Sequence, residues 1–273
     1  THLLPRLNGF ELLMASYAMA HLKLDLLLTE TGYKNSPPIG GVSTGRGGQR
    51  LRVYLTNSLE EASSERPNLF MSQWLTEEAI QADSIKRDAP VMCVIGNPPY
   101  VRQELLGQQQ KDFFSVKYKN VYNGTADLYV YFYDLSISIL KENGLLGFIT
   151  PNKWMERKYG FELRSYLINL DILQIINFGE LRIFEDASTE PEITILKNSS
   201  INKTKIEYKM IKSLNEAKQT PYLLIEYDKS KLNSSIWRFN DHKSFNILEK
   251  FKTSNVTLKE YTKKGIFYGI KTG

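Results

Sequence analysis

The sequence predicts an α/β protein with a doubly wound, mostly parallel sheet. Two observations support this fold class. Short apolar runs bounded by turn residues alternate with helical patterns, and several runs are continuously apolar, as in strands buried on both faces. A chain of 273 residues with 42% hydrophobic residues can bury a substantial core. We place a boundary between a core at residues 1–200 and a C-terminal extension at 201–273, where the alternation gives way to short strands.

The first ninety residues contain two segments with clear local signals. The segment 12–31 is rich in Ala, Leu and Met and is followed by Gly32, which predicts a long helix. Pro37-Pro38 and several glycines predict a connecting loop. In chain order we expect a strand end at 6–11, a helix at 12–31, a loop at 34–49, a strand at 51–55 and a weak helix at 76–86.

The alternation is strongest in the middle of the chain. A second long helix opens near Thr125 and Asp127 and closes at Asn143-Gly144. In chain order we expect a buried strand at 90–95, a helix at 126–142, a strand at 145–150, a helix at 159–170, strands at 172–178 and 192–196, and a helix near 242–252.

Composition limits the function classes. The net charge of +5 and a pI near 9.0 are compatible with a nucleic-acid partner. The single cysteine, Cys93, lies in a predicted strand, so we expect a small core residue and no disulfide within the chain, as fits a cytoplasmic protein. The three histidines are scattered, which argues against a metal site, and no apolar run is long enough for a membrane span.

The strongest chemical signal is Asn97-Pro98-Pro99-Tyr100, directly after the strand at 90–95. Ligands bind at the carboxyl ends of strands in open α/β sheets. Asn97 Oδ1 and the Pro98 carbonyl can accept hydrogen bonds from the amino group of a planar ring, while Tyr100 stacks on the ring face. Pro98 restricts Asn97 to an extended backbone, so both acceptors can point the same way. Such acceptors would polarise the amine nitrogen for attack on a methyl donor.

This tetrapeptide resembles the catalytic motif of amino-methyltransferases that modify adenine N6 in DNA. The resemblance covers roughly residues 7–197 and implies a Rossmann-like methyltransferase sheet, S-adenosyl-L-methionine as cofactor and double-stranded DNA as partner. It implies catalytic roles for Asn97, Pro98, Pro99 and Tyr100. A proline turn with a capping Asn and a core Tyr is the structural alternative for this segment.

The resemblance also assigns roles to four other positions. Glu11 would accept from the cofactor's ribose hydroxyls, Asn57 would contact its adenine amine, and Asp127 would lie behind the cofactor pocket. The family commonly has Asp where this chain has Asn57. Phe184 would pack with Tyr100 against the flipped base. Each residue also has a structural interpretation: a helix-start acid for Glu11, a turn for Asn57, a helix cap for Asp127 and a core aromatic for Phe184.

The family's glycine-rich loop, which holds the methionine end of the cofactor, normally precedes the position of Glu11. The residues before Glu11 contain no such loop, so we expect a core without its first strand and with poor cofactor binding on its own. Residues 264–273 resemble the start of a target-recognition domain. The chain as a whole is similar to the methylase part of large bacterial restriction-modification polypeptides, which implies a fused or separate nuclease and a specificity domain.

Three other functions stay open on the sequence alone. Cytosine N4 presents the same donors as adenine N6 and would suit the same acceptors. Glutamine amides in proteins are a further substrate class, although the insertions and the C-terminal extension favour DNA. A non-catalytic DNA-binding module of methyltransferase descent is the alternative outside enzymes.

Overall fold

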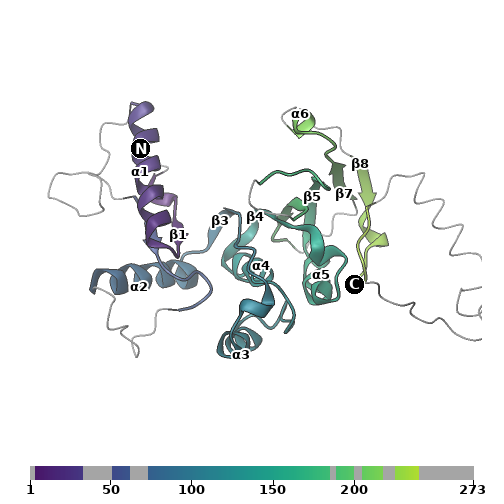
Figure 1. The fold of residues 1–273 in the computed structure, drawn as a ribbon, viewed down its shortest axis with the longest axis horizontal. Helices are drawn as coiled ribbons and strands as arrows, with labels where there is room; N and C mark the ends of the chain where they lie inside the picture. The colour runs from purple at the N-terminus through teal and green to yellow at the C-terminus, as the bar shows by residue number, and fades with distance from the viewer. Residues whose placement is uncertain are drawn as a thin grey trace, which may run out of the picture.

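The computed structural model describes residues 4–32, 51–61, 73–184, 189–199, 205–217 and 225–239, which form two sheets with flanking helices (Figure 1). The expected loop at 34–49, the helix near 242–252 and the segment 264–273 lie outside the described residues. No helix in the described ranges is long and apolar enough to cross a membrane.

The elements follow the predicted alternation. The α-helices are α1 (Met14–Glu30), α2 (Gln73–Asp88), α3 (Gln108–Lys117), α4 (Tyr129–Ile139), α5 (Phe161–Leu167) and α6 (Leu214–Ala217). The strands are β1 (Gly9–Glu11), β2 (Val53–Leu55), β3 (Val91–Gly96), β4 (Leu140–Pro151), β5 (Asp171–Asn177), β6 (Pro191–Lys197), β7 (Lys205–Met210) and β8 (Ile225–Asp228). Short 3-10 helices are η1 (Leu4–Arg6), η2 (Gln103–Leu105), η3 (Asn152–Met155), η4 (Lys158–Gly160) and η5 (Lys229–Lys231).

The larger sheet has the strand order β3-β4-β6-β5-β7-β8. The pairs β3–β4 and β5–β7 are parallel, whereas β6 is antiparallel to both β4 and β5. It follows that β3, β4, β5 and β7 point the same way, and the mostly parallel α/β sheet is confirmed. Strands β7 and β8 continue this sheet beyond residue 200, so main-chain hydrogen bonds join the extension to the core.

Several helix boundaries differ from the prediction by up to three residues, and the end of α4 has a clear structural cause. The helix expected at 126–142 ends at Ile139, and β4 begins at Leu140. Asn143 takes a positive φ of 65°, donates from its N–H to the Asn198 carbonyl, and Asn198 donates back to the Gly144 carbonyl. Pairing with Asn198 therefore overrides the helix propensity of residues 140–142. Helix α3 was not predicted, because its sequence is polar apart from one short aromatic pair.

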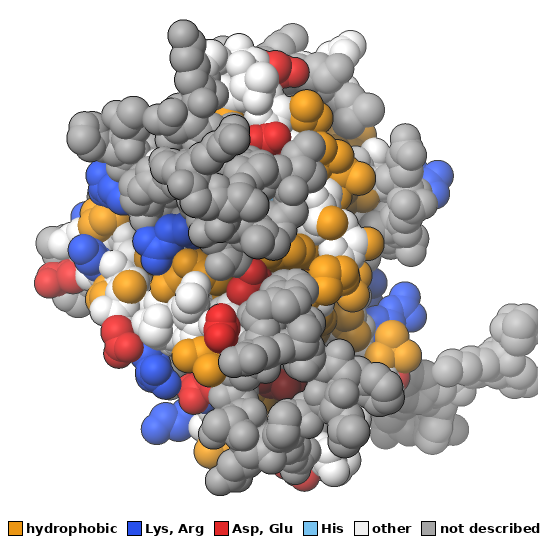
Figure 2. Space-filling view, turned by 90° about the vertical axis from the view of Figure 1, so that its left-hand side faces the viewer, with side chains coloured by type: hydrophobic (Ala, Val, Ile, Leu, Met, Phe, Trp, Pro, Cys, Tyr) orange, Lys and Arg blue, Asp and Glu red, His pale blue; other side chains and the backbone are white. Residues whose placement is uncertain are grey.

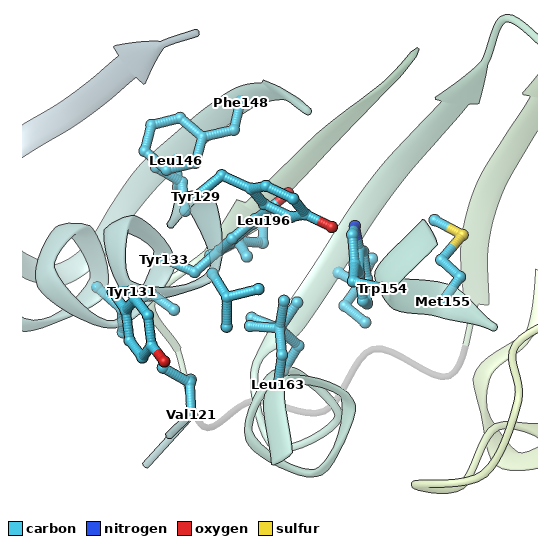
Figure 3. Packing of buried hydrophobic residues seen from close by; sticks show 14 of the residues in the cluster. Val121, Tyr129, Tyr131, Tyr133, Leu146, Phe148, Trp154, Met155, Leu163 and Leu196 are labelled. Atoms are coloured by element: carbon cyan, nitrogen blue, oxygen red, sulfur yellow. The ribbon is translucent and has the colours of Figure 1, made fainter. Parts of the chain in front are cut away.

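The main core is aromatic and centres on α4 (Figure 3). Tyr129, Tyr131 and Tyr133 are all almost fully buried, and each hydroxyl has a partner. They pair with the Tyr159 hydroxyl at 2.9 Å, the Asn123 carbonyl at 3.0 Å and the Thr150 hydroxyl at 3.1 Å, respectively. A buried phenol without such a partner would be costly, so these bonds fix α4 against the sheet.

The expectation that 90–95 is a buried strand with Cys93 in the core is wrong. Cys93 is exposed, Met92 is 53% exposed and Ile95 is 83% exposed. Strand β3 pairs with β4 along one edge, and no strand among the described residues pairs with the other edge. An apolar sequence alone cannot bury a strand when one neighbour is missing.

The smaller sheet pairs β1 and β2 in parallel and packs against α1 and α2. Helix α1 buries Tyr17 there but leaves a series of apolar side chains exposed. On the side of the molecule that holds α1 and α2, hydrophobic side chains gather in a band (Figure 2). The exposed members from these helices are Met14, Met19, Leu24, Leu26, Leu27 and Ile80.

A buried acid joins the elements of this smaller unit, and its removal should destabilise them. Glu78 of α2 accepts hydrogen bonds from the Tyr17 hydroxyl and the Leu55 N–H, both at 3.0 Å. Glu78→Ala leaves two buried donors without that acceptor, so we expect a loss of about 2 kcal/mol. Urea unfolding measures this loss of unfolding free energy, and hydrogen exchange at β2 locates it in the smaller unit. Glu77→Ala, which removes an exposed acid, is the control, and equal effects of the two changes would contradict the assignment.

Candidate active site

The segment Asn97-Pro98-Pro99-Tyr100 leaves the carboxyl end of β3 without regular secondary structure. Asn97 is exposed and Pro98 is buried, so the loop is anchored while the asparagine faces outward. Strand β4 ends beside it, because β3 and β4 are parallel neighbours with Gly96 opposite Phe148. Asn97, one of the two acceptors predicted from sequence, therefore lies exposed at the carboxyl end of β3, next to the buried Pro98.

Tyr100 is fixed at its hydroxyl end. The hydroxyl donates to the Ile149 carbonyl of β4 at 3.3 Å. Partial burial raises the pKa of the Tyr100 phenol to about 12, so it stays a neutral donor at physiological pH. The ring therefore contributes shape and a π-face to the site.

Phe184 lies next to Tyr100, as the resemblance implies. Their ring centroids are 6.3 Å apart with an interplanar angle of 70°, and Tyr129 approaches Tyr100 from 6.4 Å at 79°. Both contacts are edge-to-face, a favourable arrangement for aromatic pairs. The structure thus brings the two predicted base-stacking residues together, with their planes crossed rather than parallel.

Asp127 supports the loop that follows Tyr100. Its Oδ1 accepts from the Gln103 N–H at 3.2 Å, and the neighbouring Leu128 N–H donates to the Val101 carbonyl at 2.9 Å. Burial raises the pKa of the Asp127 carboxyl group, while the cations Lys153 and Arg102 oppose that shift. Asp127 therefore ties the segment before α4 to the loop that follows Tyr100, a supporting contact that the sequence did not predict.

Glu11 lies at the end of β1, in the smaller sheet. Its Oε1 accepts from the N–H groups of Leu12 and Leu13, at 2.9 and 3.0 Å. Both bonds use one oxygen, so the second carboxylate oxygen keeps its acceptor capacity. The geometry matches a carboxylate set at a strand end, and its contact with a ribose stays a prediction.

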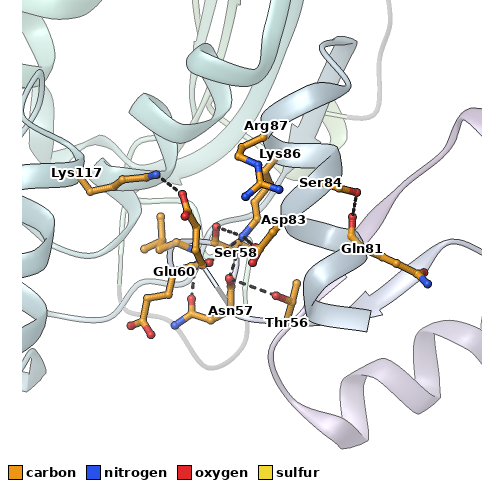
Figure 4. A network of polar contacts seen from close by, with 12 residues as sticks. Thr56, Asn57, Ser58, Glu60, Gln81, Asp83, Ser84, Lys86, Arg87 and Lys117 are labelled. Atoms are coloured by element: carbon orange, nitrogen blue, oxygen red, sulfur yellow. Dashed lines mark hydrogen bonds and ion pairs between the residues drawn. The ribbon is translucent and has the colours of Figure 1, made fainter. Parts of the chain in front are cut away.

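Asn57 follows β2 in a loop held by basic side chains (Figure 4). Its Oδ1 accepts from the Leu59 N–H at 3.1 Å, as in an ordinary turn. Lys86 of α2 is nearly buried, pairs with Asp83 at 2.6 Å and donates to the Glu60 carbonyl at 2.8 Å. The amide oxygen retains a second lone pair for a ligand, and contact with the cofactor stays a prediction.

Two groups of predicted residues emerge from this geometry. Asn97, Tyr100, Phe184 and Asp127 surround the carboxyl ends of β3 and β4. Glu11 and Asn57 lie at the ends of β1 and β2, in the separate two-stranded sheet. No local sequence pattern pointed to Lys86, because the backbone carbonyls that it contacts belong to a loop that is distant in the sequence.

Comparison with known proteins identifies the family. Residues 17–184 match the family described as Eco57I restriction-modification methylase, over more than half of the chain. This chain belongs to that family.

Two curated relatives share part of their length with the chain. The type II methyltransferase M.BstVI of Geobacillus stearothermophilus is 30% identical over 227 residues, covering 72% of this chain and 39% of the relative. The type II restriction enzyme and methyltransferase RM.Eco57I of Escherichia coli is 29% identical over 184 residues, covering 63% of this chain and 18% of the relative. The chain thus spans well under half of the length of these relatives.

Solved structures of restriction-modification proteins share the fold. The ATP-dependent type ISP enzyme LlaBIII bound to DNA matches 75% of this chain and 15% of its own chain, with a TM-score of 0.52 and 19% identity. The DrdV–DNA complex matches 75% of this chain and 21% of its own, with a TM-score of 0.54 and 16% identity. At these identities the likeness establishes the fold.

Membership of this methylase family identifies S-adenosyl-L-methionine as the cofactor. The polar groups at the ends of β1 and β2 suit it chemically. A carboxylate such as Glu11 matches the paired hydroxyls of a ribose, and an amide oxygen such as that of Asn57 matches a ring amine. A glycine-rich loop for the methionine end is not found in the described residues before Glu11.

Lys86 gives a direct test of how the Asn57 loop is held. Lys86→Met removes the cation from a nearly buried pair, so we expect a loss of about 3 kcal/mol of unfolding free energy. Urea denaturation measures it, and the double variant Asp83→Asn/Lys86→Met should recover part of the loss. Arg87→Met, at an exposed cation on the same helix, is the control. If the losses caused by Asp83→Asn alone and by Lys86→Met alone add up to the loss in the double variant, then the two residues are not coupled.

Proposed function

We propose that this chain is the methyl-transferring core of a DNA adenine-N6 methyltransferase, the modification part of a restriction-modification system. One observation supports this proposal most: Asn97 is exposed at the carboxyl end of β3 beside Tyr100 and Phe184, in a chain of a methylase family. The Asn97 amide, the Pro98 carbonyl and the Tyr100 ring all belong to this one loop, and together they offer two carbonyl acceptors and an aromatic ring. These groups match a planar ring with an exocyclic amine.

The chemistry follows from those acceptors. S-adenosyl-L-methionine, when bound, supplies an electrophilic methyl group on a sulfonium. Asn97 Oδ1 and the Pro98 carbonyl oxygen accept hydrogen bonds from the two N–H groups of the target amine and favour a more tetrahedral, nucleophilic nitrogen. This stabilisation grows as positive charge develops on the nitrogen, so it lowers the barrier more than it strengthens binding. The proton leaves to water afterwards, and no general base is needed.

Base flipping sets the role of the aromatic pair. An adenine inside a duplex must leave the stack, and stacking on protein aromatics offsets that cost. Tyr100 and Phe184 now meet edge-to-face, so both cannot stack on one planar base as they stand. We therefore expect the Phe184 ring to turn when a base enters, while the hydroxyl bond to Ile149 keeps Tyr100 in place.

We further propose that a strand outside the described residues completes the sheet between β1 and β3, with the glycine-rich loop at its end. The second edges of β1 and β3 have no strand partner among the described residues, and β3 exposes Met92 and Ile95. Exposed main-chain groups beside apolar side chains favour pairing with an added strand. The core at 1–200 would then lack only its first strand and loop, and DNA, a nuclease and a specificity domain would engage other parts of the longer polypeptide.

Asn97→Ala in the full-length protein should lower kcat for methyl transfer at least about 100-fold, because the transition state loses an acceptor. Cofactor binding should stay within about twofold. A modified-base map of the source genome, with and without the variant, measures the result and names the base. Loss of N6-methyladenine at one sequence supports the proposal, and loss of N4-methylcytosine would change the target base. Unchanged methylation would remove Asn97 from the mechanism and favour a non-catalytic module.

Cys93 reports on the added strand, because it is the only cysteine of this chain and lies on β3. A maleimide should label Cys93 rapidly in the 273-residue chain and at least about tenfold more slowly in the full-length protein, as located by peptide mapping. Titration with S-adenosylhomocysteine should show weaker binding to the shorter chain. Equal labelling and equal affinity in the two proteins would contradict a missing strand.

A further inference from the structure

A fully buried acid lies beneath the candidate site. Glu192 of β6 is 0% exposed. Its Oε1 accepts from the Trp154 indole N–H at 2.6 Å and from the Thr194 hydroxyl at 3.1 Å. Its Oε2 is buried and has no hydrogen-bond partner among the described residues. A buried polar atom without a hydrogen-bond partner lowers the stability of the fold, so a carboxyl group at this position suggests a functional role.

Among the described residues, no cation contributes to the electrostatics of Glu192. The titratable groups that face it are the phenols of Tyr133 on α4 and Tyr208 on β7. Its strand neighbours are Thr150 on β4 and Asn177 on β5, and both are uncharged. Burial raises the pKa of the Glu192 carboxyl to about 8, with the bonds from Trp154 and Thr194 opposing the shift. The group is therefore mostly protonated at neutral pH.

Trp154 connects Glu192 with the candidate site through side-chain contacts. It belongs to η3, which directly follows β4, and its ring lies 6.0 Å from that of Tyr133 (Figure 3). Tyr133 in turn bonds to the Thr150 hydroxyl at 3.1 Å. The next residue back along β4, Ile149, supplies the carbonyl that holds Tyr100. A continuous set of contacts thus runs from Glu192 to the ring that would receive the base.

The C-terminal extension fixes the other side of η3. Trp237 packs on Trp154 at 5.3 Å and donates from its backbone N–H to the Met155 carbonyl at 2.9 Å. Arg164 adds hydrogen bonds to the Trp154 and Arg157 carbonyls. Helix η3 is therefore held between the extension and Glu192, so a change at Glu192 reaches the end of β4 rather than dissipating in a loose segment.

We propose that Glu192, in its uncharged form, is a positioning residue for methyl transfer: it holds Trp154 and thereby the end of β4 against which Tyr100 rests. This inference relies on the proposed function for its kinetic consequence. A negative charge at Glu192 would be buried without a cation, and water would have to enter or Trp154 would have to move. The structure around Tyr100 should then loosen as the pH rises.

The pH dependence has a defined sign. The carboxyl group has a usual pKa of 4.5 in the unfolded chain and about 8 in the folded protein. Because the folded state holds the proton more tightly, the stability contributed by Glu192 is complete below pH 4.5 and is lost as the pH rises toward 8. Glu192→Gln keeps the shape but cannot ionise, so it should remove this part of the pH dependence.

The test uses the full-length protein and its Glu192→Gln and Glu192→Ala variants, with Glu180→Gln, at an exposed acid that follows β5, as control. Between pH 5 and 8.5 the urea midpoint of the unmodified protein should fall relative to that of Glu192→Gln. Hydrogen exchange at 148–155 should speed up with pH in the unmodified protein more than in Glu192→Gln, and should be fastest in Glu192→Ala.

In methyl transfer, Glu192→Ala should lower kcat about 10-fold to 100-fold with little change in KM, whereas Glu192→Gln should retain kcat at neutral pH. Parallel pH profiles of the unmodified protein and Glu192→Gln, in both midpoint and exchange, would overturn the inference even if Glu192→Ala fails to fold. Absence of methyl transfer in the unmodified protein would refute the proposed function instead, since the midpoint and exchange readouts do not depend on it.

Discussion

The main-chain pairing of β4 with its two neighbours is the interaction on which the rest of the site depends. Its parallel pairing with β3 brings the loop that begins at Asn97 to the end of β4, where the Tyr100 hydroxyl donates to the Ile149 carbonyl. Its antiparallel pairing with β6 sets Glu192 opposite Thr150. A slip of one residue would turn every side chain of a strand to the opposite face, so this register decides which groups meet. The site is therefore specified by backbone hydrogen bonds before any ligand is present.

The molecule differs on the two sides of β3. Toward β4 lies an aromatic core in which the buried hydroxyls of Tyr129 and Tyr133 are paired. On the other side β3 exposes apolar side chains, and the smaller sheet with Glu11 and Asn57 shares no strand pairing with it. The groups proposed to hold the base and those proposed to hold the cofactor thus belong to separate sheets. The loop after β2 is joined to the end of α3 by a hydrogen bond from the Tyr118 hydroxyl to the Leu59 carbonyl at 2.6 Å and by the Lys117–Glu61 ion pair.

Polar groups near the site divide by solvent exposure. Asn97 is exposed and can exchange water for a ligand amine at little cost. Asp127 and Tyr100 are partly buried, and each makes a bond that supports a loop. Glu192 is fully buried and has no cation beside it among the described residues, so burial favours its protonated form. The roles proposed for these residues, which are recognition for Asn97, support for Asp127 and Tyr100 and a pH response for Glu192, therefore follow their depth in the fold.

The sequence by itself determined the fold class, the order of most elements and the position of Asn97-Pro98-Pro99-Tyr100 after a strand, because periodicity and turn residues are local signals. The proximity of Phe184 to Tyr100 came from the family resemblance. Only the tertiary structure decided that Cys93 is exposed, that residues 140–142 join β4, and that Glu192 is buried below the site. Each of these three features depends on whether a partner distant in the sequence is present. A local sequence pattern cannot show such partners.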